Sequence, residues 1–281
     1  MVNIIIKEEY QRQIYNTEQF PNGVVPKKWR LGDRQVEQWI LPYTVHHIED
    51  WAFAHCRNLK ELWLPKRKLT AGQGILDGCD KLLRIDVYEL TEENIRIFKD
   101  EAEVLAYAVR FAPIHDVLDV TDIGTEKWYD WLDEQICRYL DTPDDKGFDP
   151  FLAGGEEDYE DPANHVEYYR FLRQQEKSLV LLARLRNAKC LKAEQEEIYA
   201  DYMSGHEEAL LAILLEKREQ AYSDLTLCGK QGVITLENVD NFLKKMDEPC
   251  FTESRAYLLH LKEEMRKQDT QGEIWEEWSL S

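Results

Sequence analysis

A spacing of 23 residues recurs near the start of the chain. Leu41-Pro42 returns as Leu64-Pro65, and Cys56 returns as Cys79, at that same offset. The stretch Val36-x-x-Trp39-x-Leu41-Pro42 aligns with Leu59-x-x-Leu62-x-Leu64-Pro65 and with Leu82-x-x-Ile85-x-Val87. Several positions held at one fixed period predict repeated units, each of which buries its apolar face against its neighbours.

Each unit is expected to be a short strand followed by a turn back. Side chains alternate faces along a strand, so every second residue of the L-x-x-L-x-L pattern should point inward. Cys56 and Cys79 fall in the returning turn, where a small buried side chain suits a tight corner. Two full units are legible, whereas stacks of this kind need about three. We therefore expect residues 1–35 and the following helices to cap the stack, with 2–6 as a capping strand.

The segments Ala52-Phe-Ala-His-Cys-Arg-Asn-Leu59 and Ile75-Leu-Asp-Gly-Cys-Asp-Lys-Leu82 resemble the BspA-like class of bacterial leucine-rich repeats. The resemblance covers about residues 36–88, and the wider layout is similar to leucine-rich repeat proteins of anaerobic Firmicutes. It implies a short leucine-rich-repeat β-solenoid that binds a partner protein. The predicted partner-binding residues are the strand-face positions Gln38, Ile40, Glu61, Trp63, Arg84 and Asp86. Trp63 is either an exposed contact or is packed under a cap.

The rest of the chain is expected to be helical. Thr91 is a plausible helix start, and Thr125 opens a second helix in which Trp128 and Trp131 favour core positions over a ligand platform. From Asn164 onward, short helix pairs resemble degenerate ankyrin repeats, although the T-P-L-H motif is missing. The fold class predicted is α/β, mostly α: a leucine-rich-repeat solenoid followed by an ankyrin-like helical region. The predicted divisions are 1–90, 91–163 and 164–281.

Charge is unevenly distributed along the chain. The formal net charge is −20, and residues 91–165 contain 21 acidic and 6 basic residues, a net of −15. Such a chain should repel nucleic acid and anionic membranes. The acidic segment is a solvated surface, a docking face for a basic partner, a cation site, or a mimic of nucleic acid that occupies a DNA-binding protein.

A long acidic loop is predicted over residues 141–161. It contains Glu156, Glu157, Asp158 and Asp161, whose oxygens are candidate ligands for a divalent cation. Their spacing does not match an EF-hand loop. The best candidate for a metal-dependent hydrolase combines three of these ligands with two residues outside the loop: Glu156, Glu157 and Asp158 with His115 and Asp116.

Sequence motifs of catalysis are missing from the chain. It contains no G-x-S-x-G, H-E-x-x-H, P-loop or G-x-G-x-x-G pattern. Its six cysteines are scattered without a C-x-x-C pair, which predicts reduced thiols in a cytoplasm. The sequence thus predicts a non-catalytic scaffold that has no cofactor and binds a partner protein.

Overall fold

The chain forms two compact units, Met1–Cys137 and Arg138–Ser281. The structure, a computed structural model, describes residues 7–92, 94–148 and 162–279 of the 281. The boundary between the units falls inside helix α4 (Glu126–Leu140). The three-part division expected from the sequence remains a prediction about which segments fold independently.

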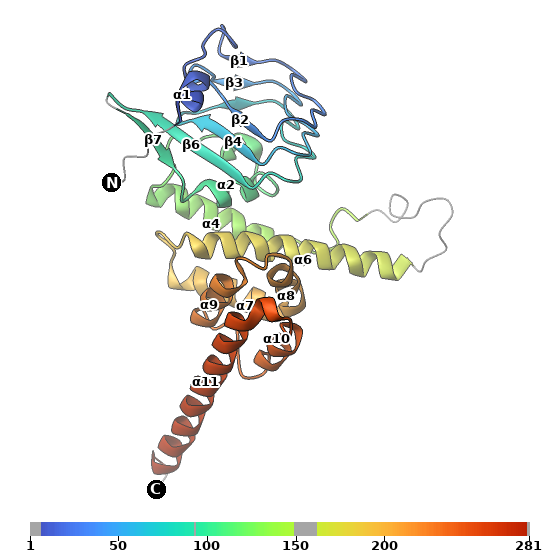
Figure 1. The fold of residues 1–281 in the computed structure, drawn as a ribbon, viewed down its shortest axis with the longest axis vertical. Helices are drawn as coiled ribbons and strands as arrows, with labels where there is room; N and C mark the ends of the chain where they lie inside the picture. The colour runs from blue at the N-terminus through green and yellow to red at the C-terminus, as the bar shows by residue number, and fades with distance from the viewer. Residues whose placement is uncertain (1–6, 93, 149–161, 280–281) are drawn as a thin grey trace. The chain divides into compact units, whose positions relative to one another are not determined.

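The N-terminal unit contains every strand that the structure describes, together with short helices (Figure 1). Its strands are β1 (Val24–Val25), β2 (Gln38–Ile40), β3 (His47–Ile48), β4 (Glu61–Pro65), β5 (Thr70–Ala71), β6 (Arg84–Leu90) and β7 (Ile95–Phe98). Its helices are α1 (Glu8–Ile14), α2 (Ala102–Ala108), α3 (Ile114–Val117) and most of α4.

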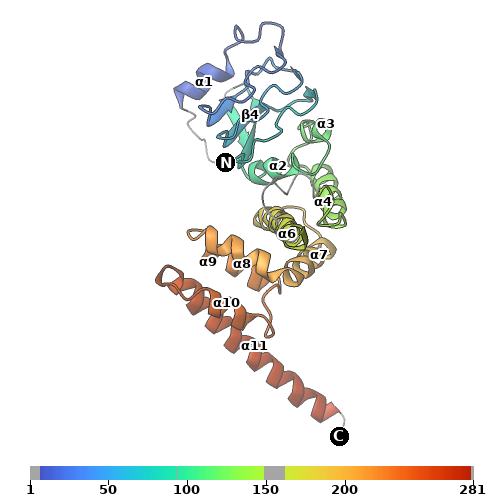
Figure 2. The same cartoon turned by 90° about the vertical axis from the view of Figure 1, so that its right-hand side faces the viewer.

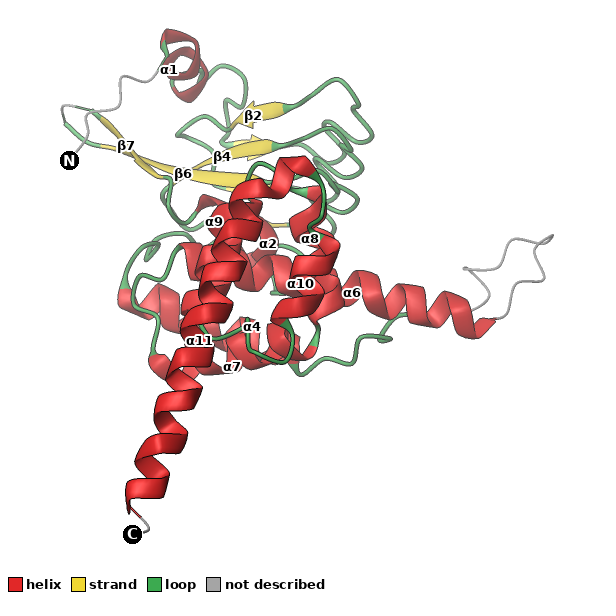
Figure 3. Cartoon of the chain, turned by 60° about the horizontal axis from the view of Figure 1, so that its bottom comes forward, coloured by secondary structure: helices red, strands yellow, loops and turns green. Residues whose placement is uncertain are grey.

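The strands form two separate sheets, and the 23-residue period sets the register in both. One sheet has the parallel order β1-β3-β5, and the other has the order β2-β4-β6-β7, with β6 and β7 antiparallel. Gln38 pairs with Glu61 and Glu61 with Arg84, so that equivalent residues of successive units stand side by side. Figure 3 shows β2, β4 and β6 as successive yellow arrows with the loops beside them. The inward leucines and their equivalents, Leu62, Leu64, Ile85 and Val87, are fully buried.

The turns of successive units are also joined. The Cys56 thiol donates to the carbonyl of Arg30, and the Cys79 thiol donates to that of Phe53, both at 3.1 Å. Left-handed backbone recurs at the same period, at Lys28, Trp51 and Gly74 and again at Gly32, His55 and Gly78. The segment from Val24 to Asp33 therefore has the backbone of a further unit, although its side chains do not follow the pattern.

The described residues do not form the leucine-rich β-solenoid that the sequence predicted. In the described residues the two sheets remain open, and three of the strands have only two residues. The sheet that contains β2 ends in an antiparallel strand, β7, instead of a further repeated unit. The physical reason lies in β6, which is seven residues long and folds back through a hairpin onto β7. The fold is α/β, with two short sheets and abundant helices.

The expected helix start at Thr91 is likewise wrong. Thr91 closes the β6–β7 hairpin, where its backbone N–H donates to the Asn94 carbonyl at 2.8 Å. The helix begins later, at α2, which packs against β6. The predicted start of α4 is confirmed, since the Thr125 hydroxyl oxygen accepts a 3.4 Å hydrogen bond from the Trp128 backbone N–H.

Helix α1 packs on the face of the larger sheet that bears Ile40 and Trp63. Its last residue, Ile14, is fully buried in an apolar cluster with Ile40, Trp63 and Tyr88. The Tyr10 ring meets Trp63 edge-on, at 5.2 Å between centroids. The cap expected from residues 1–35 therefore includes this helix, whereas residues 2–6 lie outside the described residues.

The C-terminal unit is helical throughout its described part. It contains α6 (Pro162–Arg186), α7 (Ala193–Gly205), α8 (Glu207–Glu216), α9 (Ala221–Lys230), α10 (Val239–Lys245), a 3₁₀ turn (Pro249–Phe251) and α11 (Thr252–Ser279). Helix α6 packs against α7, α8 and α9, and α10 runs beside the start of α11 (Figure 2). Lys177 is buried in α6, where its ammonium donates to Asp144 and to the carbonyls of Leu140 and Thr142.

The ankyrin-like part of the predicted fold class is a second correction. The helices α6 and α11 run for 25 and 28 residues, whereas ankyrin repeats are built from short helix pairs at a period of about 33 residues. The apolar face of α6 spans three partners, and a helix of that length cannot be one arm of such a hairpin.

Candidate functional site

Four polar residues form a continuous ladder on the part of the β2-β4-β6 face that α1 leaves uncovered. We call Gln38, Glu61, Arg84 and Asp86 the strand-face ladder. The Gln38 amide donates to the Glu61 carboxylate at 2.5 Å, and Arg84 Nε lies 3.7 Å from the other Glu61 oxygen. Arg84 also donates to both Asp86 oxygens, at 3.1 and 2.8 Å. The 23-residue register produces this ladder, because it aligns equivalent positions across the strands.

The ladder contains more negative than positive charge. Two carboxylates, Glu61 and Asp86, share the single guanidinium of Arg84. Burial raises the pKa of Glu61, and the neighbouring Asp86 charge raises it further. The hydrogen bond to Asp86 raises the pKa of Arg84. Arg84 and Lys99 both act to lower the pKa of Glu61, but burial and Asp86 outweigh them, so a further cation brought to this face would stabilise ionised Glu61.

The predicted contact residues divide into two groups. Gln38, Glu61 and Arg84 are half-exposed and therefore accessible. Ile40 and Trp63 are only 1% and 6% exposed under α1, so the expected accessibility of Ile40 is wrong. Asp86 is also buried, because Arg84 lies across its carboxylate. Of the two interpretations of Trp63, packing under a cap is the one observed.

The predicted divalent-cation ligands Glu156, Glu157, Asp158 and Asp161 lie outside the described residues, so that site stays a prediction. Among the residues that are described, no group of three His, Cys, Asp or Glu side chains is placed to hold a metal ion. His115 and Asp116 are close, with 3.4 Å between Nε2 and Oδ1, and both side chains are exposed.

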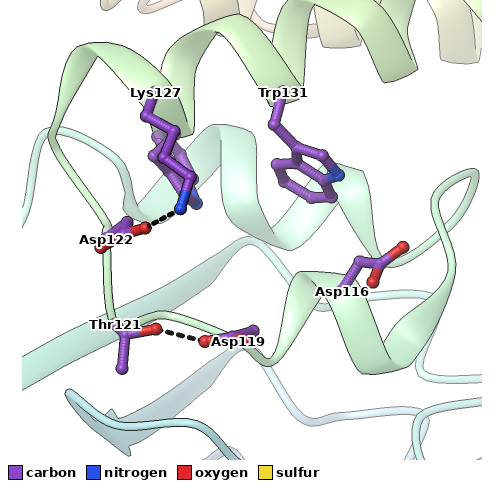
Figure 4. Close-up of a pocket in the computed structure, with 7 residues that line it drawn as sticks. Asp116, Asp119, Thr121, Asp122, Lys127 and Trp131 are labelled. Atoms are coloured by element: carbon purple, nitrogen blue, oxygen red, sulfur yellow. Dashed lines mark hydrogen bonds and ion pairs between the residues drawn. The ribbon is translucent and has the colours of Figure 1, made fainter.

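A small open pocket lies between α3 and the first turns of α4 (Figure 4). We call it the Trp131 pocket; its volume is about 210 Å³, and its lining residues are Asp116, Asp119, Thr121, Asp122, Lys127, Trp128 and Trp131. Figure 4 shows Trp131 extending from α4 toward the α3 turn that bears Asp116. The Trp128 and Trp131 rings lie 6.4 Å apart between centroids and form an aromatic wall.

The carboxylates of this pocket differ in how far they are already compensated. Lys127 donates to Asp122 at 2.6 Å, and this bond raises the pKa of Lys127. Burial acts to raise the pKa of Asp119, but hydrogen bonds from Thr121 and Lys68 outweigh it and hold that pKa below its ordinary value. Within the described ranges, the ionic contact of Asp116 is with the exposed His115. Lys127 meets Asp122 and Lys68 meets Asp119, so the uncompensated negative charge of the lining is that of Asp116.

The sequence did not indicate this pocket. Trp128 and Trp131 were both assigned to the core, and Trp128 is indeed 4% exposed, but Trp131 is half-buried and lines the pocket. The helix α3 that bears Asp116 is only four residues long, too short to produce a periodic pattern. The placement of three aspartates within seven residues, at positions 116, 119 and 122, is the one signal that the sequence offers.

Comparison with known proteins finds no matching family model, no matching curated protein and no matching solved structure. The resemblance to BspA-like repeats therefore stays a prediction. Within the described residues, none of the helices combines the length and the apolar character needed to cross a membrane.

Proposed function

We propose that this chain is a non-catalytic protein-interaction scaffold, and that its strand-face ladder contacts the partner protein. The observation that carries the proposal is the ladder itself, in which the half-exposed side chains of Gln38, Glu61 and Arg84 stand at fixed spacing on neighbouring parallel strands. Rigid strands hold these groups in place before binding, so less conformational entropy is lost when a partner arrives.

The charge of the ladder favours a partner that presents a basic group to it. Glu61 and Asp86 share the guanidinium of Arg84. The pKa of Glu61 is raised because burial and the Asp86 charge both disfavour its ionised form. A lysine or arginine of the partner would lower that pKa and gain a charge-assisted hydrogen bond. The apolar cluster under α1 lies on the same face of the sheet and holds strands β2, β4 and β6 in place beside the ladder.

We place the protein in the cytoplasm as part of the same proposal. All six cysteines are free thiols, three of them in the buried interior and two exposed at the surface. Free thiols at both depths suit a reducing compartment, because disulfides form and persist mainly in oxidising ones.

The test is affinity capture from the native host with matched variants of the ladder. Glu61→Lys places a positive charge beside Arg84 and opposite the basic group of the proposed partner. Recovery of the partner should fall about tenfold or more, because like charges across an interface cost several kcal/mol. Glu37→Lys makes the same charge change at an exposed carboxylate outside the ladder and should leave recovery unchanged.

Arg84→Gln serves as a second ladder variant, and thermal melting establishes that each variant is folded. A protein recovered by the wild type and by Glu37→Lys, but lost with both ladder variants, supports the proposal. Identical capture by all four folded proteins would remove the ladder from the interface.

A further inference from the structure

We propose that the Trp131 pocket binds the side chain of an arginine residue in a partner protein. This site is separate from the strand-face ladder, and the inference holds whether or not the ladder binds anything. The pocket combines a half-exposed indole, Trp131, with a carboxylate, Asp116, that has no strong cationic partner in the described structure. These are the two groups that a guanidinium engages at once, by stacking on a ring and by charge-assisted hydrogen bonding.

The positions of the lining residues favour one cation at one end of the pocket. Figure 4 shows Trp131 and Asp116 together at one side, and the Lys127–Asp122 and Thr121–Asp119 pairs at the other. The second pair is already compensated, since Asp119 also meets Lys68 at 3.3 Å. The free negative charge is therefore concentrated where the indole face is available.

The size of the pocket agrees with a single side chain. Sites for drug-sized ligands have volumes of about 300–1,000 Å³, whereas this pocket has about 210 Å³ and is open to solvent on one side. A planar guanidinium can enter such an opening while its stem remains attached to a chain outside.

Trp128 supplies a second indication that the ligand is part of a polypeptide. Its side chain lines the same pocket and is 4% exposed, and its indole N–H is buried without an acceptor among the described residues. A buried donor without an acceptor is costly, and native structures rarely leave one. A peptide carbonyl can serve as the missing acceptor once the side chains that cover this N–H move aside, whereas a bare inorganic cation offers no acceptor.

The test is ¹⁹F NMR of the full chain labelled with 5-fluorotryptophan, with the Trp131 signal assigned through Trp131→Phe. N-acetyl-arginine methylamide is the probe, and the corresponding citrulline and lysine amides are its comparators. Citrulline has the shape of arginine without its charge. We expect saturable shifts of the Trp131 signal with the arginine amide, weaker ones with lysine and none with citrulline.

Matched variants locate the effect. Asp116→Asn should weaken binding of the arginine amide about threefold to tenfold, the loss expected for one charge-assisted contact. Glu126→Gln removes the same charge from an exposed position of α4 outside the pocket lining and should leave affinity unchanged. Equal binding of citrulline or lysine, unchanged affinity in Asp116→Asn, or no saturable shift in the folded wild type would each overturn the proposal.

Discussion

At the scale of single residues, the left-handed backbone positions are where the repeated turns are most sensitive to sequence. Gly32, His55 and Gly78 occupy one such column, with φ of +72°, +59° and +67°. A Cβ added at Gly32 would meet no atom within 4 Å, whereas a Cβ at Gly78 would lie 2.4 Å from the His55 ring. The two glycines therefore share a backbone conformation and differ in their surroundings.

Gly32→Ala is expected to cost about 1 kcal/mol of unfolding free energy, the penalty of a left-handed conformation alone. Gly78→Ala should cost about 1 kcal/mol more, because the His55 ring must also move. Chemical denaturation measures both, and the excess should disappear when His55→Ala is combined with Gly78→Ala. If Gly78→Ala still costs more than Gly32→Ala when His55 is alanine, the extra cost comes from the backbone and not from the His55 ring.

Glu61 makes stability depend on pH in a direction that its pKa shift fixes. Burial, with Asp86, raises its pKa in the folded state above the unfolded value of about 4.3. The contribution of Glu61 is therefore fully present below that unfolded value and is lost as the pH rises through the folded pKa.

Glu61→Gln should accordingly have a higher melting temperature than the wild type at pH 7, and this gain should vanish below about pH 4. Melting curves across that range measure it. Glu37→Gln, at an exposed carboxylate that pairs with Lys60, is the control and should behave like the wild type. A variant less stable than the wild type at pH 7 would mean that the Arg84 contact outweighs burial.

At the scale of elements, α1 is the part whose role in the sheet can be measured most directly. Ile14→Ala should cost about 2–4 kcal/mol, because Ile14 is fully buried against Ile40 and Trp63. Arg12→Ala, at a side chain that is 81% exposed, should cost almost nothing. Denaturant titration with tryptophan emission as the readout distinguishes them. Equal stability of the two variants would mean that α1 does not hold the sheet.

The elements also show how far the sequence alone could lead. The period of 23 residues placed Gln38, Glu61 and Arg84 at equivalent positions, and in the structure Gln38 pairs with Glu61 and Glu61 pairs with Arg84, because register is a property of spacing. The period could not reveal the first unit, because its side chains do not follow the repeat pattern. Its turn nevertheless has the same left-handed backbone as its neighbours, at Lys28 and Gly32. Nor could the period predict β7, since the alternation over Ile95–Phe98 covers only four residues and follows a residue, Thr91, that also begins helices.

The candidate sites were predicted unequally for the same reason. Positions on the strand face follow from alternation, but their exposure depends on α1, which is remote in sequence from Ile40 and Trp63. The Trp131 pocket depends on how a four-residue helix meets the start of α4, and no local pattern encodes that meeting.

At the scale of the whole molecule, the net charge of −20 has a measurable cost. Self-repulsion of that size destabilises a compact state, and salt screens it, since the Debye length falls from about 30 Å at 0.01 M to about 10 Å at 0.1 M. We expect the melting temperature to rise between 10 and about 100 mM NaCl. Calorimetry measures the change. A fall would show that surface ion pairs such as Lys27–Asp50 contribute more than the repulsion does.

The two ends of the larger sheet are closed differently: α1 packs over β2, and the β6–β7 hairpin forms the other end. Strands β2, β4 and β6 pair in parallel in the same 23-residue register. The apolar cluster under α1 includes residues of β2, β4 and β6 (Ile40, Trp63 and Tyr88), so a further unit inserted between these strands would have to supply an apolar residue at the same position. Duplication of one 23-residue unit would widen the face by one strand spacing, about 4.8 Å. A strand added in this way would bring one more row of outward-facing positions into register with Gln38, Glu61 and Arg84.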